Sequence, residues 1–273
     1  MLTIDATCTN QPQASASANK ISAIIPARNE AECIRFVILS LLALRTQGGQ
    51  RLVDEVIVAD NGSSDNTAQI ARDAGAHVVS VPQPGYGRAC WEAVQISTGD
   101  VLLFIDGDGA ADPRDAESLL AWLVSGAELV IGVRQNPDPG SMSAPQRWGN
   151  ELACFLVRII WRAPVNDLGP YRAIRRAAFD ALDMRDRNFG WTVEMQVRAH
   201  VLGLCVANQP VQWHARLAGR SKISGTVWGV VGAGAGILGM IARLWWRERR
   251  RPVNESMSFR SKAVVSDVSK IVR

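Results

Sequence analysis

The stretch DVLLFIDGDGAADP, residues 100–113, decides the fold. It begins with an uninterrupted apolar run, which is typical of a strand buried on both faces of a sheet. Two carboxylates, Asp106 and Asp108, follow at once, and Gly107 between them lets the backbone turn tightly. Ligands of parallel α/β sheets bind beyond the carboxyl ends of the strands. The stretch therefore predicts a site at the edge of such a sheet.

The same alternation continues on both sides of this stretch. Short β-branched runs are followed by segments whose apolar residues recur every three or four positions, which indicates strands alternating with amphipathic helices. This pattern predicts a single α/β catalytic domain with a Rossmann-like, mostly parallel sheet and helices on both faces. We expect strands over residues 21–26, 53–59, 77–81, 100–105, 128–133, 167–174 and 205–213, and helices over about 34–44, 67–74, 86–97, 114–125, 147–161, 176–182 and 191–202.

Two further polar clusters, residues 27–30 and 60–65, also follow expected strands. Their convergence with the acidic pair predicts a small-molecule site and argues against a structural protein. Asp60 could accept a bond from a nucleotide base or a ribose hydroxyl, or its segment could simply form a turn that caps the next helix. Gly87 and Arg88 open a helix whose N-terminus could bind an anion, although the full G-x-G-x-x-G pattern of dinucleotide enzymes is missing.

Asp106 and Asp108 are candidate metal ligands. Hard cations such as Mg²⁺ prefer oxygen ligands, and Mg²⁺ is often bound by one or two carboxylates together with substrate phosphates. The alternative is a solvated acidic turn. The position of the pair at the end of a buried strand, beside another acidic cluster, favours Mg²⁺ or Mn²⁺ bound with a diphosphate.

The net charge of +4 is confined to one segment. Residues 243–251 contain five arginines and one glutamate, so the rest of the 273-residue chain is formally neutral. This argues against nucleic acid and for one local anionic partner. The arginines follow an apolar stretch, residues 226–242, and two tryptophans, a pattern typical of the interface of an anionic membrane. We expect peripheral attachment at the inner membrane face; a true span and a helix buried on the domain are the alternatives.

These patterns divide the chain into four parts. Residues 1–20 lack the apolar core of a signal peptide and are expected to be a disordered head of a cytoplasmic protein. Residues 21–224 form the domain, with a nucleotide-binding half (21–135) and an acceptor half (136–224). Residues 225–251 form the membrane-proximal helix, and 252–273 a flexible tail.

Seven ordered motifs resemble the family 2 glycosyltransferases, which have the GT-A fold: IIPARNE, VADNGSSDNT, PGYGRA, LLFIDGDGAADP, DLGPYRAI, FGWTVEMQ and GRSKISGT. Within that family they are most similar to the dolichyl- and polyprenyl-phosphate hexosyltransferases. The resemblance implies an inverting enzyme that moves a hexose from a nucleotide-diphosphate sugar, with UDP-glucose favoured, to a polyprenyl-phosphate acceptor. The alternatives are transfer to a soluble hydroxyl acceptor with Glu194 as the base, and a sugar nucleotidyltransferase.

The resemblance also implies roles for individual residues. Metal binding falls to the acidic pair, chiefly Asp108, with Asp106 near the ribose or the metal. The segment WHARLA, residues 213–218, has fewer basic residues than the family pattern suggests. The remaining assignments are Pro26, Arg28, Glu30 and Asp60 for the nucleotide, Arg134 and Arg172 for the diphosphate and acceptor phosphate, Glu194 on the acceptor side, and Arg220, Ser221 and Lys222 in a loop that closes over the donor.

Overall fold

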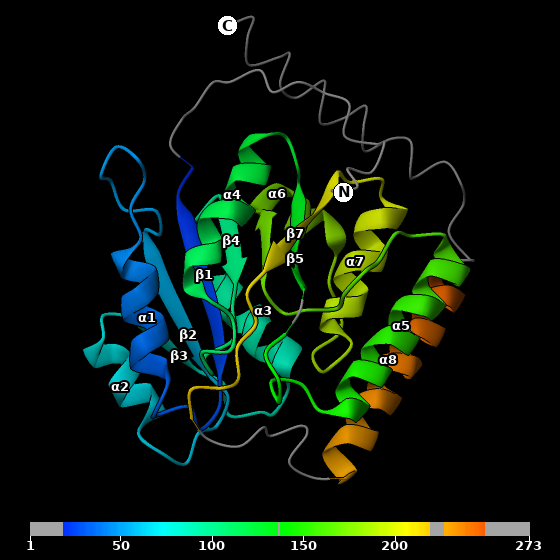
Figure 1. Cartoon of the computed structure of the whole chain (residues 1–273), viewed down its shortest axis with the longest axis horizontal. Coiled ribbons are helices and arrows are strands. Elements are labelled where there is room, and N and C mark those ends of the chain that lie inside the picture. The colour runs from blue at the N-terminus through cyan, green and yellow to red at the C-terminus, as the bar shows by residue number, and fades with distance from the viewer. Residues whose placement is uncertain (1–18, 136, 219–226, 249–273) are drawn as a thin grey trace, which may run out of the picture.

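The computed structural model describes residues 19–135, 137–218 and 227–248. Its centre is a seven-stranded sheet with the order β3-β2-β1-β4-β6-β5-β7 (Figure 1). Among these strands, β6 alone runs antiparallel to its neighbours, β4 and β5. The strands are β1 (Ile21–Ala27), β2 (Glu55–Asp60), β3 (His77–Ser80), β4 (Val101–Phe104), β5 (Leu129–Arg134), β6 (Arg172–Arg175) and β7 (Val206–Val211).

Helices cover both faces of this sheet, as the apolar strands predict. Consecutive residues of one strand, such as Ile24 and Ile25, enter different core clusters on opposite faces. The first cluster lies under α1, α2 and α4, and the second under α3, α6 and α7. The helices are α1 (Ile34–Ala43), α2 (Thr67–Asp73), α3 (Tyr86–Ile96), the 3₁₀ turn η1 (Pro113–Asp115), α4 (Ala116–Val124), α5 (Ala144–Trp161), α6 (Arg176–Leu182), α7 (Trp191–Val201) and α8 (Val227–Glu248).

The expected single α/β domain with a mostly parallel sheet is confirmed, and the start of β6 shows the largest difference from an expected strand boundary. We expected a strand over residues 167–174, but β6 spans only Arg172–Arg175. The carboxylate of Asp167 is instead engaged by the main-chain N–H and the side chain of Arg134 at the end of β5. Pro170, two residues before β6, has no N–H to donate to a ladder. The strand therefore begins only after this turn.

The two longest helices, α5 and α8, lie beside each other at the right-hand edge of Figure 1. Met240, Ile241 and Leu244 of α8 are buried in a third core cluster with residues of α5 and α7. This packing agrees with the alternative of a helix buried on the domain, but only for one face of α8, because Leu238 and Trp246 are exposed. Among the helices that the structure describes, none combines the length and the apolar character that a membrane span requires.

Candidate functional site

The site is built on the adjacent strands β2, β1 and β4, which run parallel and therefore end at the same edge of the sheet. The loops after β1 and β2 are joined by hydrogen bonds. Asn61 donates its main-chain N–H to the carbonyl of Ala27 (2.8 Å), and the N–H of Glu30 donates to Oγ1 of Thr67 (2.8 Å). The polar clusters after these two strands are thus held next to each other, as the sequence predicts.

Asp108 is the most enclosed carboxylate of this edge, with 6% of its surface exposed. Its Oδ1 accepts a bond from the N–H of Ala110 (3.0 Å), and its Oδ2 lies 2.9 Å from Nη2 of Arg216. The other terminal nitrogen of Arg216 lies 3.4 Å from Oε1 of Glu30. One guanidinium therefore bridges two carboxylates that come from the ends of different strands.

Arg216 belongs to the segment that follows β7 and crosses the acidic turn. The N–H of Leu217 donates to the carbonyl of Asp108 (3.3 Å), and the N–H of His214 to that of Ala110 (2.7 Å). Gly109 has a φ of +71°, and a Cβ there would lie 2.5 Å from the side chain of Leu217. Sequence reasoning missed Arg216, although it lies in the WHARLA segment that we judged poor in basic residues.

Asp106 lies beside Asp108 and accepts a hydrogen bond from the hydroxyl of Tyr86 (3.1 Å). Burial, together with the negative charge of Asp108, raises the pKa of Asp106 from 3.8 to about 7. Burial likewise raises the pKa of Tyr86 well above its usual range, so this residue acts as a hydrogen-bond donor. The pair is therefore a site where bringing in positive charge is favourable.

This acidic pair fits a divalent cation that also binds a substrate. Among the described residues, no group of three or more His, Cys, Asp and Glu side chains could hold a metal ion by itself. Two carboxylates are enough for Mg²⁺ or Mn²⁺ when phosphate oxygens complete the coordination. The guanidinium on Asp108 shows that the enclosed carboxylate pairs with a cation in the folded chain.

Replacing Asp106 by asparagine is expected to stabilise the metal-free protein more at pH 8 than at pH 5. Between about pH 4 and pH 7, folded Asp106 holds a proton that the unfolded chain releases, so its contribution to stability falls as the pH rises. Asparagine removes this dependence. The measurement is the melting temperature of both proteins in EDTA at the two pH values. Melting temperatures that differ by a constant amount would contradict the raised pKa.

Gly107 is required at its position for packing. A Cβ there would lie 3.0 Å from Cδ1 of Ile34 and 3.2 Å from Cγ2 of Ile25, tighter than ordinary contacts. The glycine lets the acidic turn lie directly against the core between β1 and α1.

Gly87 and Arg88, expected at an anion-binding helix terminus, contact another part of the chain. Their main-chain N–H groups donate to the carbonyls of Asn188 (3.2 Å) and Arg187 (2.8 Å). A Cβ on Gly87 would lie 2.7 Å from the carbonyl oxygen of Asp186. The absence of a side chain at Gly87 thus lets the loop before α7 pack closely against it. The N–H groups of Gly87 and Arg88 are already hydrogen-bonded within the protein.

Asp60 ends β2, and its Oδ1 accepts a bond from the N–H of Ser63 (3.2 Å), which agrees with the alternative of a turn. Its neighbour Asn61, which sequence reasoning passed over, donates to the carbonyls of Val81 (2.9 Å) and Gln83 (2.7 Å). Asn61 thereby fixes the loop after β3 beside the acidic edge. Pro26, near the end of β1, is half-buried, and Arg28, in the loop that follows, is exposed.

Arg134 and Arg172 are held inside the protein. Arg134 donates Nε to Oδ2 of Asp167 (2.8 Å), and its guanidinium lies 5.3 Å from the ring centre of Trp213. Arg172 is buried and donates to the carbonyls of Gly169 (2.7 Å) and Thr192 (2.8 Å). Its Nη2 has no hydrogen-bond partner among the described residues, and burial lowers the pKa of this residue to about 10.

Glu194, at the start of α7, is 1% exposed. Its Oε2 accepts bonds from the N–H groups of Arg185 (2.9 Å) and Asp186 (2.7 Å), and its Oε1 lies 3.4 Å from Nη1 of Arg247. The carboxylate therefore ties the loop before α7 to the end of α8. Its role as a general base stays a prediction. Arg220, Ser221 and Lys222 lie outside the described residues.

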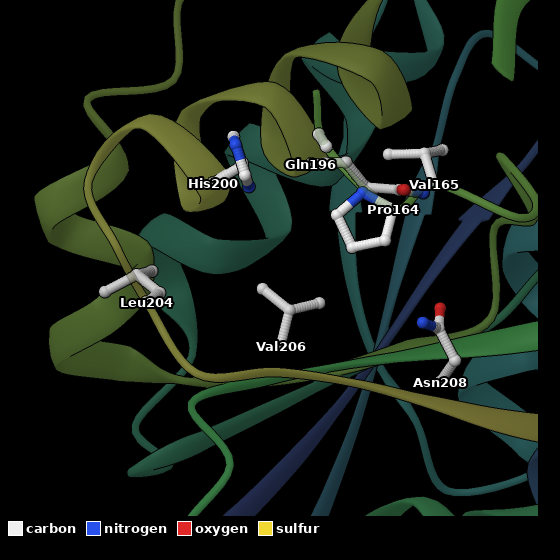
Figure 2. Close-up of a pocket in the computed structure, with 8 residues that line it drawn as sticks. Pro164, Val165, Gln196, His200, Leu204, Val206 and Asn208 are labelled. Atoms are coloured by element: carbon white, nitrogen blue, oxygen red, sulfur yellow. The ribbon is translucent and has the colours of Figure 1, made fainter. Parts of the chain in front are cut away.

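A cavity between α7 and the beginning of β7 is separate from these residues (Figure 2). Its wall is formed by Pro164, Val165, Gln196, Leu204 and other side chains, none of which we expected in the site. His200 also lines it and lies 3.0 Å from the carbonyl of Trp161 through Nε2, which agrees with a structural histidine.

The comparisons with known proteins identify the family. The model named Glycosyl transferase family 2 matches residues 22–183. An uncharacterized glycosyltransferase of Mycobacterium tuberculosis is 36% identical over 213 residues, which cover 77% of this chain and 93% of that protein. The chain belongs to glycosyltransferase family 2. This confirms the resemblance seen in the seven motifs.

Solved structures extend the comparison of this family 2 glycosyltransferase to bound molecules. Glucosyl-3-phosphoglycerate synthase from Mycobacterium tuberculosis, in complex with Mn²⁺, UDP-glucose and phosphoglyceric acid, is 26% identical with a TM-score of 0.66, covering 83% of this chain and 81% of that one. Mannosyl-3-phosphoglycerate synthase from Rubrobacter xylanophilus is 22% identical with a TM-score of 0.69, covering 85% and 76%. The second similarity supports only the fold, which is GT-A.

Proposed function

We propose that this family 2 glycosyltransferase moves a hexose from a UDP-hexose to a hydroxyl group of a small, soluble, anionic acceptor. The observation that carries the proposal is the acidic turn at the end of β4, where Asp108 is enclosed against a guanidinium that also reaches Glu30 in the loop after β1. Support for the donor and acceptor classes comes from the related structure that holds UDP-glucose and phosphoglyceric acid. We therefore place the soluble acceptor ahead of the polyprenyl phosphate.

The donor half of the proposed site consists of the nucleotide loops and the acidic pair. Pro26, Arg28, Glu30 and Asp60 would line the nucleotide, with Asp60 turned toward the base or ribose. Asp106 and Asp108 would hold Mg²⁺ or Mn²⁺, which when bound offsets the negative charge that develops on the departing diphosphate. The donor's diphosphate would also attract the Arg216 guanidinium, and we propose that Lys222, Arg220 and Ser221 close over it.

The acceptor half is proposed to lie on the side of β6 and α7. Arg172 carries a buried guanidinium nitrogen without a hydrogen-bond partner in the described part of the chain, which suits the anionic group of an acceptor once that group reaches it. Arg134, through its ion pair with Asp167, would help to position the residues around Arg172. A hydroxyl acceptor must lose its proton during an inverting transfer, and we keep Glu194 as the proposed base. To act in this way, its carboxylate must exchange the main-chain partners that it has in the described structure.

The test is a panel of transfer reactions with the full chain. UDP- and GDP-hexoses are each combined with 3-phosphoglycerate or with a polyprenyl phosphate, in Mn²⁺ or in excess EDTA. We expect transfer from a UDP-hexose to the soluble acceptor, loss of activity in EDTA and recovery with Mn²⁺. The anomeric configuration of the product, read by NMR, tests the expected inversion.

Each arm of the panel can overturn one part of the proposal. Transfer only to the lipid phosphate would restore the polyprenyl acceptor as the main hypothesis. Full activity in excess chelator would contradict a metal-dependent mechanism. Release of pyrophosphate from a nucleoside triphosphate and a sugar phosphate, without any glycosyl transfer, would indicate the nucleotidyltransferase, which family membership disfavours.

A further inference from the structure

The outer side of α5 carries a row of exposed apolar side chains. Trp148, Phe155 and Ile159 are 71%, 52% and 61% exposed, and Leu152 completes the row at 36%. Their spacing of four, three and four residues places them on one line along the helix. The opposite side of the same helix packs into the protein through Ala153 and other buried residues. Both sides of α5 are therefore apolar, although only one is covered by the described part of the chain.

A second row lies on the neighbouring helix α8. Leu238, Trp245 and Trp246 are exposed, whereas Met240 and Leu244 are buried against α5 and α7. Because α5 and α8 lie beside each other at one edge of the molecule (Figure 1), we describe the two rows together as the α5–α8 face. An exposed apolar surface on this scale marks a binding surface more often than ordinary solvent-exposed residues do.

Arginines border this face. Arg147, Arg158 and Arg162 are exposed at α5 and Arg243 on α8, against one exposed acidic residue, Glu151, within the described parts of these helices. By helical spacing, the three arginines of α5 lie along one side of its apolar row, and Glu151 lies among them. Within the described parts of α5 and α8, exposed arginines therefore outnumber exposed acidic residues by four to one.

We propose that the α5–α8 face docks on an anionic lipid surface. The apolar row would enter the interfacial layer, where tryptophan is favoured, and the bordering arginines would meet the lipid phosphates. A second copy of the chain is the competing occupant, and the light-scattering measurement below tests it. The proposal concerns where the enzyme sits, and it does not depend on the acceptor proposed above.

The test is co-sedimentation of the full chain with vesicles of phosphatidylcholine alone or with 30% phosphatidylglycerol. We expect binding to the anionic vesicles at low salt, little binding to the neutral ones, and release at high salt because screening weakens the attraction. The double variant F155S/I159S should lower the partition coefficient about tenfold or more, since two apolar side chains no longer enter the interface.

The matched control is F36S. Phe36, on α1, is 52% exposed, as Phe155 is, but it lies outside the α5–α8 face. This variant should bind vesicles as the unchanged protein does. Equal losses in F36S and F155S/I159S, or no binding of the unchanged protein, would overturn the proposal.

Two further measurements distinguish lipid docking from self-association and from the catalytic activity. Light scattering that shows a dimer dissociated by F155S/I159S, without any vesicle binding, would assign the face to a second copy. Glycosyl transfer to a soluble acceptor, assayed without vesicles, should be unchanged in the double variant. A failure of docking is therefore distinguishable from a failure of the proposed function.

Discussion

Replacing Asp108 by asparagine is expected to lower kcat/KM for the donor by about a thousandfold. The amide keeps the size of the side chain and can still accept the bond from the N–H of Ala110. It loses the negative charge that pairs with Arg216 and that would hold a divalent cation. The measurement is steady-state transfer from UDP-hexose in the presence of Mn²⁺, with the melting temperature recorded to establish that the variant is folded.

The matched control for this change is D73N. Asp73 lies on α2, is exposed, and accepts a hydrogen bond from the side chain of Gln69 one helical turn away. The same loss of one carboxylate should leave kcat/KM within about twofold, because surface charges of this kind contribute little. If D108N retained more than a tenth of the activity, the acidic turn would not be the centre of the site.

Replacing Arg134 by methionine is expected to lower the free energy of unfolding by about 3–5 kcal/mol. Asp167 is buried, and the guanidinium of Arg134 engages both of its carboxylate oxygens. Methionine would fill much of the same volume but would leave the carboxylate without its counter-charge. Urea unfolding at neutral pH gives the free energy directly.

The R114M variant provides the comparison for a pair that is open to solvent. Arg114 also forms an ion pair with an aspartate, Asp112, but its side chain is 83% exposed. Its loss should change the free energy of unfolding far less than the loss of Arg134 does, because solvent screens an exposed ion pair. If R134M and R114M were equally stable, the buried pair would have no special structural role, and Arg134 could be assigned to ligand binding alone.

The helices and strands could be predicted because their signal is local. Apolar spacing identified each element and grouped Asp60 with the acidic pair, since parallel strands end at a common edge. The site also depends on contacts between distant segments. Arg216 pairs with Asp108, which is 108 positions away in the chain, and the N–H of Gly87 donates to a carbonyl of the loop before α7. Neither contact produces a periodic pattern in the sequence.

The direction of β6 and the environment of Glu194 also depend on contacts between distant segments and could not be predicted from local patterns. A short apolar run has the same pattern in a parallel and in an antiparallel strand, so only the contacts with β4 and β5 decide. Glu194 opens a helix, where an acidic residue is ordinary. Only the folded chain shows that its carboxylate holds two main-chain N–H groups of a neighbouring loop.

The bridge made by Arg216 between Glu30 and Asp108 bears on the order in which ligands bind. A tethered guanidinium is present at high effective concentration and competes with any free divalent ion for Asp108. An ion that is already chelated by a nucleotide brings phosphate oxygens with it. The guanidinium of Arg216 can then leave Asp108 and pair with these oxygens, so that Asp108 becomes available to the ion. We therefore expect ion and donor to raise each other's affinity by one common factor, as reciprocal linkage requires. The enzyme would then load the chelate as a unit and discriminate against the bare ion.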